Sequence, residues 1–126
     1  MAINPDMDVL IVDDASATRR IVRRLLTELG FKNLREAENG QVALDELKRK
    51  KADFVVSDWS MPVMNGIELQ RAIRADENLK TIRVLIVTSE VKQENILEAV
   101  QAGVSDYIVK PFNAATLLEK LNQIFT

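Results

Sequence analysis

The stretch Val9-Leu10-Ile11-Val12-Asp13-Asp14 decides the fold class of this chain. Its first four residues are all apolar, a run that is too short for a helix and lacks the alternation of a half-exposed strand. Such a run is typical of a strand buried on both faces, as in parallel sheets covered by helices. It ends abruptly in two carboxylates. We therefore expect a buried parallel strand that brings an acidic pair to the edge of a sheet.

The rest of the 126-residue chain repeats this unit. Comparable runs predict strands at 34–37, 54–57, 84–87 and 107–109. Apolar residues three and four apart predict a helix after each strand, at positions within 21–29, 42–47, 67–73, 96–100 and 117–124. Five strand–helix units predict an α/β fold, a five-stranded parallel sheet with helices on both faces. We expect residues 1–126 to form a single domain.

Local signals indicate where some of these elements begin and end. Ser16 is the expected N-cap of the first helix, and Gly30 is its expected stop. Asn39-Gly40 is compatible with a hairpin turn, but the helical spacing that follows favours a second helix. We expect glycines at element boundaries, where their conformational freedom is used.

The composition restricts the chemistry that is available. The chain has no histidine and no cysteine, which excludes Cys/His zinc sites, thiol nucleophiles, Ser-His-Asp triads and disulfides. A net charge of −2 indicates neither nucleic-acid nor membrane-surface binding. We find no signal peptide and no apolar run near the roughly 20 residues that span a bilayer. The absence of cysteine is compatible with the cytoplasm, where we expect this protein.

Polar residues gather where four of the predicted strands end. Asp13 and Asp14 follow the first strand, Asp58 the third, Thr88 the fourth and Lys110 the fifth. Sites in open α/β sheets form beyond these ends. Crowded carboxylates repel one another unless a cation joins them, and hard oxygen ligands suit Mg²⁺. A metal, an ammonium, a hydroxyl donor and an oxygen nucleophile are the groups that phosphoryl transfer needs.

Each residue taken alone has a simpler explanation. Asp13 or Asp14 could cap the next helix, Thr88 could be a capping hydroxyl, and Lys110 could be a solvated amine. Their joint placement favours a shared site. The chain has no phosphate-binding glycine-rich loop, and its acids are adjacent, unlike the Asp-x-Asp of haloacid-dehalogenase-type phosphatases.

With these residues the chain resembles the receiver domains of two-component response regulators, and among them the single-domain chemotaxis type. The resemblance runs from about Val9 to Phe125. The motifs that carry it are Val12-Asp13-Asp14, Arg19-Arg20-Ile21-Val22-Arg23, Ser57-Asp58-Trp59-Ser60-Met61-Pro62, Val87-Thr88-Ser89-Glu90 and Tyr107-Ile108-Val109-Lys110-Pro111-Phe112. The resemblance, rather than the pattern, implies a flavodoxin-like fold with strand order 2-1-3-4-5.

The resemblance also implies a role for each site residue. Asp58 would accept a phosphoryl group from a sensor histidine kinase. Mg²⁺ would be held by Asp14, Asp58 and the backbone carbonyl of Ser60, and by Asp13 through water. Lys110, after which a cis peptide bond to proline is expected, would pair with Asp58 and then with its phosphoryl group.

The expected output face comprises the fourth helix, the fifth strand and the fifth helix. Its switch residues by resemblance are Thr88, Val91, Ile96, Tyr107, Phe112 and Lys120. Without the resemblance, most of these are ordinary core or surface positions, and Tyr107 could be an aromatic residue on a sheet edge. We interpret the arginines at 19, 20, 23 and 24 as a solvated helix face rather than a partner site.

Three departures from the best-known members concern rate and output. Ser60 stands where they carry Asn, and together with Glu90 it is expected to tune dephosphorylation, which leaves the use of a phosphatase open. Gln93 and Gln123 replace lysines of the motor-binding face. Ala15 replaces a larger residue beside the acidic pair.

The sequence therefore predicts a monomeric, cytoplasmic phosphorylation switch without an effector domain. It would catalyse only its own phosphorylation and dephosphorylation, and bind a chemotaxis-type sensor histidine kinase and the flagellar motor switch protein. One alternative is a phosphate sink that drains the kinase without binding the motor. Others are a Mg²⁺-dependent phosphohydrolase and a binding module that is never phosphorylated.

Overall fold

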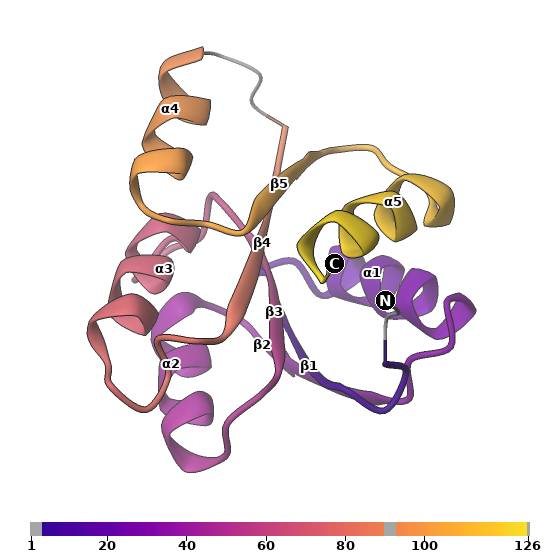
Figure 1. The fold of residues 1–126 in the computed structure, drawn as a ribbon, viewed down its shortest axis with the longest axis horizontal. Helices are drawn as coiled ribbons and strands as arrows, with labels where there is room; N and C mark the ends of the chain where they lie inside the picture. The colour runs from indigo at the N-terminus through magenta and orange to yellow at the C-terminus, as the bar shows by residue number, and fades with distance from the viewer. Residues whose placement is uncertain (1–3, 90–92, 126) are drawn as a thin grey trace.

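The computed structural model of the chain describes the backbone of residues 4–89 and 93–125, and the side chains of these residues except 93–96. Within this part of the chain, strands and helices alternate throughout (Figure 1). The strands are β1 (Asp8–Val12), β2 (Asn33–Ala37), β3 (Phe54–Asp58), β4 (Arg83–Thr88) and β5 (Asp106–Val109). The helices are α1 (Ser16–Glu28), α2 (Gly40–Arg49), α3 (Gly66–Ala75), α4 (Gln93–Gln101) and α5 (Ala114–Ile124).

The strands form one parallel sheet in the order β2-β1-β3-β4-β5. Both the fold class and the strand order implied by the resemblance are confirmed. β1 and β3 are central, and the register places Val12 beside Ser57 and Asp58 beside Val87. The order changes direction at β1, so the loops after β1 and β3 diverge to opposite faces and leave room for a site between them.

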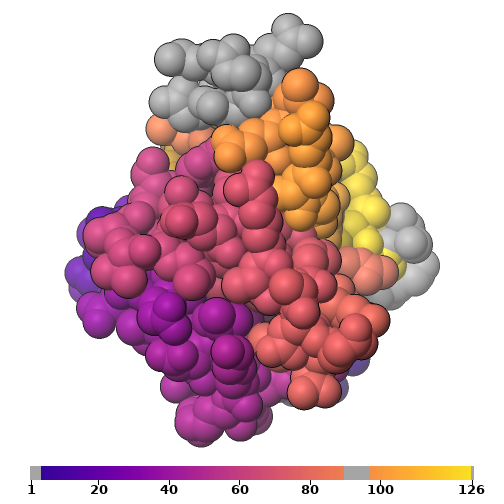
Figure 2. Space-filling view, turned by 90° about the vertical axis from the view of Figure 1, so that its left-hand side faces the viewer, coloured from indigo at the N-terminus to yellow at the C-terminus, as the bar shows by residue number. Residues whose placement is uncertain are grey.

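Helices cover both faces of the sheet (Figure 1). Alternate side chains of one strand point to opposite faces, so β1 contributes to two hydrophobic cores. Leu10 and Val12 pack in the core on the side of α2 and α3, whereas Val9 and Ile11 pack on the side of α1 and α5. Figure 2 shows the α2, α3 and α4 side. Burial of the central strands on both faces explains why their sequences are continuously apolar.

Helix ends confirm some of the expected signals and correct one. Gly30, at a φ of 102°, closes α1 with the expected pair of backbone bonds, in which its N–H reaches Thr27 and that of Phe31 reaches Leu26. Ser16, however, is the first residue of α1 rather than its N-cap. The N-cap is Ala15, whose N–H donates to Oδ1 of Asp13 at 2.9 Å. An acid two residues earlier therefore organises this turn.

The segment Asn39-Gly40 begins α2, as the helical spacing predicts. The side chain of Asn39 accepts a hydrogen bond from the N–H of Val42 at 2.9 Å and so caps the helix. Gly40 is needed here because a Cβ would lie 2.6 Å from the carbonyl oxygen of Met64. None of the helices in the described residues is long and apolar enough to cross a membrane.

Candidate functional site: an acidic cluster at the carboxyl edge of the sheet

Five predicted site residues lie at the carboxyl edge of the sheet because of where their strands end. Asp13 and Asp14 follow β1, Asp58 and Thr88 are the last residues of β3 and β4, and Lys110 follows β5. Parallel pairing aligns these ends, with Thr88 beside Val109. The fold thus brings together residues that are up to 97 positions apart in the sequence.

Three carboxylates crowd at the centre of this edge. One oxygen each from Asp13, Asp14 and Asp58 lie within 4.8 Å of one another, and we call these residues the acidic cluster. Asp13 and Asp58 are buried, whereas Asp14 is exposed and leaves the cluster open to solvent. Nζ of Lys110 lies 2.9 Å from Oδ1 of Asp58. This one ammonium does not balance three carboxylates, so the cluster favours a cation.

The environment of Asp13 changes the acidity of its side chain. Burial raises the pKa of its carboxyl group, and the neighbouring charges of Asp58 and Asp14 raise it further. The hydrogen bond from Ala15 and the charge of Lys110 act in the opposite direction without cancelling the effect. The ionised carboxylate of Asp13 is therefore less stable in the folded chain than it is in water.

The backbone around Asp58 is closely packed. A Cβ on Gly66 would lie 2.4 Å from the carbonyl oxygen of Asp58, so only glycine fits where α3 begins. The N–H of Gly66 donates to the carbonyl of Trp59 at 2.9 Å, and that of Trp59 donates to Val87 at 2.9 Å. Ser57 adds a hydrogen bond to the carbonyl of Asp58 at 2.9 Å. These contacts fix the position from which the Asp58 carboxylate projects.

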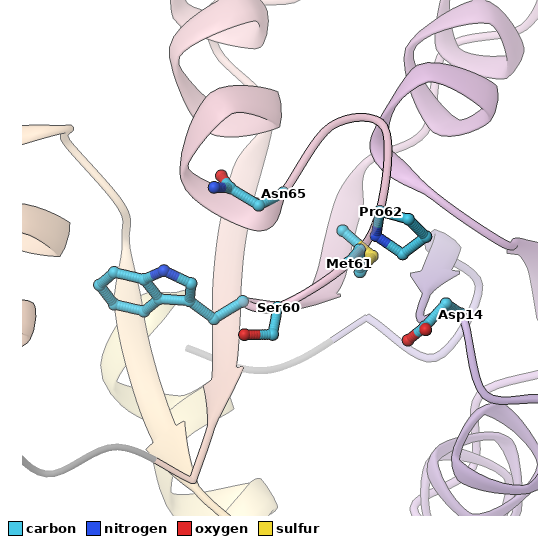
Figure 3. Close-up of a pocket in the computed structure, with 6 residues that line it drawn as sticks. Asp14, Ser60, Met61, Pro62 and Asn65 are labelled. Carbon is cyan, nitrogen blue, oxygen red and sulfur yellow. The ribbon is translucent and has the colours of Figure 1, made fainter.

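The loop between β3 and α3 forms one wall of an open hollow beside the cluster. The hollow has a volume of about 440 Å³, and Figure 3 shows Asp14 facing this loop across it. Its lining residues are Asp14, Trp59, Ser60, Met61, Pro62 and Asn65. Asn65 begins α3 with a reciprocal capping box to Glu68. Ser60 is exposed and lines the same hollow as Asp14, and its expected role as a carbonyl ligand stays a prediction.

The predicted switch residues lie around β5 where the structure describes them. Thr88 is buried, Tyr107 is half-buried on β5, and Phe112 packs at the edge of the α1 and α5 core. Nζ of Lys120 lies 5.2 Å from the centre of the Tyr107 ring and 3.3 Å from Oδ1 of Asp106. The peptide bond between Lys110 and Pro111 is cis, as expected.

Several predictions fall outside the described residues. Glu90 and Val91 lie in the segment 90–92, and the side chains of Gln93 and Ile96 are not described either. The roles assigned to these four residues stay predictions.

The interpretation of four arginines as a solvated face is wrong for Arg19, whose side chain is only 17% exposed, whereas Arg23 is 41% exposed and is both solvated and paired. Arg19 and Arg23 form hydrogen bonds with Glu36 at 2.9 and 2.6 Å, and Arg19 also donates to the carbonyl of Asp13 at 2.6 Å. Arg20 and Arg24 are exposed, as expected. The spacing of four residues places Arg19 and Arg23 on one face of α1, but it does not show that this face meets Glu36.

Comparisons with known proteins agree with this geometry. The family model of the response regulator receiver domain matches residues 9–122. The chemotaxis protein CheY-3 of Vibrio cholerae is 58% identical over 123 residues, covering 98% of this chain and 95% of the relative. The chemotaxis protein CheY of Pseudomonas aeruginosa is 55% identical over 119 residues, covering 94% of this chain and 96% of the relative.

Solved structures show the same fold. Chemotaxis protein CheY4 of Vibrio cholerae superposes with a TM-score of 0.87 at 33% identity, covering 95% of this chain and 99% of that one. The receiver domain of a Pseudomonas aeruginosa sensor histidine kinase, which holds a magnesium ion in its active site cleft, gives a TM-score of 0.85 at 28% identity. That match covers 96% of this chain and 99% of the other. The chain belongs to the response regulator receiver domain family, and its sequence relatives are chemotaxis proteins of the CheY type.

Proposed function

We propose that this protein is a chemotaxis-type phosphorylation switch whose phosphoacceptor is Asp58. The observation that carries the proposal is the charge of the acidic cluster, where three carboxylates within 4.8 Å face a single ammonium among the described residues, that of Lys110. Such a cluster is suited to an incoming cation and phosphoryl group rather than to structural pairing.

The donor set of the cluster fits Mg²⁺. Its ligand atoms are carboxylate oxygens, the site is open on the side of Asp14, and neither histidine nor cysteine is available to select a softer metal. We infer that Asp14, Asp58 and the carbonyl of Ser60 would hold the ion, and Asp13 would act through a bound water. When bound, Mg²⁺ would neutralise charge that develops on the transferred phosphoryl oxygens.

The chain's own groups would then transfer the phosphoryl group. An oxygen of Asp58 attacks the phosphorus of a phosphohistidine, the new O–P bond forms as the P–N bond breaks, and the imidazole leaves with the bonding electron pair. The 2.9 Å pair between Lys110 and Asp58 orients the carboxylate and places positive charge where the phosphoryl oxygens will lie. The buried hydroxyl of Thr88 would donate to one of these oxygens. Thr88 and Tyr107 would couple the site to the surface of α4, β5 and α5.

This mechanism predicts the partners and the place of action. The phosphoryl group would come from a chemotaxis-type sensor histidine kinase, since the chain has no histidine of its own. The phosphorylated face would bind the flagellar motor switch protein in the cytoplasm, with the receiver acting as a monomer. Beyond its own phosphorylation and dephosphorylation, we infer no enzymatic activity.

Intact-mass spectrometry after incubation with acetyl phosphate tests the phosphoacceptor. With Mg²⁺ present, we expect the wild type to gain the mass of one phosphoryl group and Asp58→Asn to gain none. Asp45→Asn, the same change at an exposed acid of α2, should be phosphorylated like the wild type. Phosphorylation that persists in Asp58→Asn, or that does not need Mg²⁺, would contradict the proposal.

A second candidate, a phosphate sink, is favoured by the output face. Gln123 is exposed on α5 where the best-known motor-binding receivers carry a lysine, so the charge available for an acidic partner is reduced. Titration of a labelled N-terminal peptide of the motor switch protein separates the two functions. Binding that tightens on phosphorylation supports the motor function, and no binding at high micromolar concentration supports the sink.

A further inference from the structure

The turn between β1 and α1 is held by hydrogen bonds to a network of charged side chains. Nη1 of Arg19 donates to the carbonyl oxygen of Asp13 at 2.6 Å, and its Nε donates to Oε1 of Glu36 at 2.9 Å. The guanidinium therefore bridges the turn that carries two acids of the cluster and the neighbouring strand β2. Only 17% of the Arg19 side chain is exposed, which limits its freedom to leave this position.

Glu36 is itself held from two sides. Its Oε2 accepts a hydrogen bond from Nε of Arg23 at 2.6 Å, while Nη2 of Arg23 donates to the carbonyl of Leu34 at 3.2 Å. Partial burial raises the pKa of Glu36, but the hydrogen bonds from Arg23 and Arg19 outweigh it and hold the pKa below its usual value. Glu36 pairs with Ile11 in the sheet register, so its backbone is held by the hydrogen bonds between β1 and β2, while its side chain is partly exposed.

The backbone of Asp13 is consequently fixed at both of its polar groups. Its N–H donates to the carbonyl of Ala37 on β2 at 3.2 Å, and its carbonyl accepts from Arg19. Its side chain accepts from the N–H of Ala15, which closes the turn. A guanidinium is suited to this task because its planar fork can hold a carbonyl and a carboxylate in one geometry.

We propose that Arg19, clamped by Glu36, is a positioning residue of the cation site: it fixes the turn that aims the carboxylates of Asp13 and Asp14 into the acidic cluster. This inference rests on the proposed binding of Mg²⁺ there. Groups that orient metal ligands from behind commonly change metal affinity by about 10- to 100-fold when they are removed.

Charge alone makes the opposite prediction. Arg19 is a cation close to a cation site, so its removal would strengthen Mg²⁺ binding if it acted only through its charge. Removal of a positioning residue weakens binding instead. The sign of the effect therefore separates the two roles.

The test is a Mg²⁺ titration at constant ionic strength, followed by Trp59 fluorescence and by calorimetry. We expect Arg19→Gln to raise the dissociation constant by about tenfold. The double variant Arg19→Gln with Glu36→Gln keeps the net charge of the wild type and should be weakened as much. Arg20→Gln, the same change at the exposed neighbour, should stay within about twofold of the wild type because its charge is screened.

Hydrogen exchange without Mg²⁺ gives a second readout that does not depend on the metal. The Ala15 amide should exchange faster in Arg19→Gln, while the Val56 amide in the core strand β3 stays unchanged. An unchanged or tighter dissociation constant in Arg19→Gln would overturn the positioning role, whatever the exchange rates show. A wild type without any response to Mg²⁺ would instead overturn the magnesium site itself, and with it this inference.

Discussion

Acidic side chains at the two ends of the sheet differ in how far their charges are paired with basic side chains. At the amino end the acids are paired: the carboxylate of Asp8 contacts Arg35 at 3.0 Å and Lys50 at 3.7 Å. Glu46 contacts Arg35 and Arg49. At the carboxyl end, within residues 4–89 and 93–125, three carboxylates of the acidic cluster share one ammonium, that of Lys110.

This difference separates stability from function within one sheet. Paired, partly buried charges at the amino end lower the energy of the folded chain. Because they neutralise one another, they do not attract a charged ligand. The excess of carboxylates over ammonium groups in the acidic cluster raises the energy of the folded chain and creates an affinity for a cation. Functional sites of proteins commonly contain interactions that lower the stability of the folded chain.

Loss of Arg35 should have the largest effect on stability. Its guanidinium contacts Asp8 and Glu46 and donates to the carbonyl of Lys50 at 2.8 Å, with only 19% of the side chain exposed. Arg35→Gln should therefore lower the free energy of unfolding in urea by about 2 kcal/mol. Its Mg²⁺ affinity should equal that of the wild type. A loss below about 0.5 kcal/mol would mean that the amino end is not stabilised by its pairing.

Loss of a charge at the carboxyl end should have the opposite sign. Asp13→Asn keeps an oxygen that can accept from Ala15 but removes a buried charge that is repelled by Asp58 and Asp14. Without Mg²⁺ at pH 7, we expect the free energy of unfolding to rise by about 1 kcal/mol. Asp8→Asn, the same substitution at the amino end, is the matched control and should be destabilised.

The pH dependence of this gain follows from the pKa of Asp13. Because that pKa is raised above 3.8 in the folded chain, ionisation of Asp13 lowers the free energy of unfolding of the wild type at pH values above the folded pKa. This loss of stability is regained as the pH falls through the folded pKa toward 3.8. The advantage of Asp13→Asn should therefore disappear on acidification. Glu46 behaves in the opposite way: the hydrogen bond from Arg49 lowers its pKa below 4.5, so its contribution is stabilising at pH 7 and is lost in acid.

Backbone strain is a second, smaller difference between the carboxyl end of the sheet and the amino end. Val63, in the loop beside the acidic cluster, has a φ of 70°, and it is the only residue other than glycine with a positive φ in the described part of the chain. A β-branched residue is disfavoured there, whereas asparagine tolerates this region. Since 79% of Val63 is exposed, Val63→Asn removes little packing and should raise the free energy of unfolding by about 0.7 kcal/mol. Destabilisation in urea would contradict the assignment of strain to this loop.

An exposed ion pair at the amino end should matter least. Nζ of Lys32 lies 3.0 Å from Asp6, but 70% and 67% of the two side chains are exposed. Lys32→Ala should change the free energy of unfolding by at most about 0.3 kcal/mol. A cost comparable to that of Arg35→Gln would show that proximity alone, rather than burial and shared contacts, stabilises this end.

Much of the fold could be predicted from the sequence because its signals are local. Continuous apolar runs such as Val9–Val12 are typical of strands that are covered on both faces, and parallel pairing then places the strand ends together. The pattern could not provide the strand order, which depends on how the connections cross the sheet. Ser16 is not the N-cap because the side chain of Asp13 accepts a hydrogen bond from the N–H of Ala15 and so organises the turn one residue ahead of the serine.

The acidic cluster was predictable, whereas its support was not. Asp13, Asp14, Asp58 and Lys110 stand at strand ends, which a linear pattern marks. Arg19 and Glu36 meet only because α1 packs over the β1–β2 edge, so the sequence alone leaves them as ordinary charged residues. Prediction from sequence therefore identifies the residues of the functional site more readily than the residues that position them.

The most direct test of this contrast is the free energy of unfolding in urea with and without Mg²⁺, for the wild type and Asp13→Asn. A ligand that binds only the folded chain stabilises it in proportion to its affinity. We predict that the variant is the more stable protein without Mg²⁺ and the wild type is the more stable at saturating Mg²⁺. The same order of stability at every Mg²⁺ concentration would contradict the account.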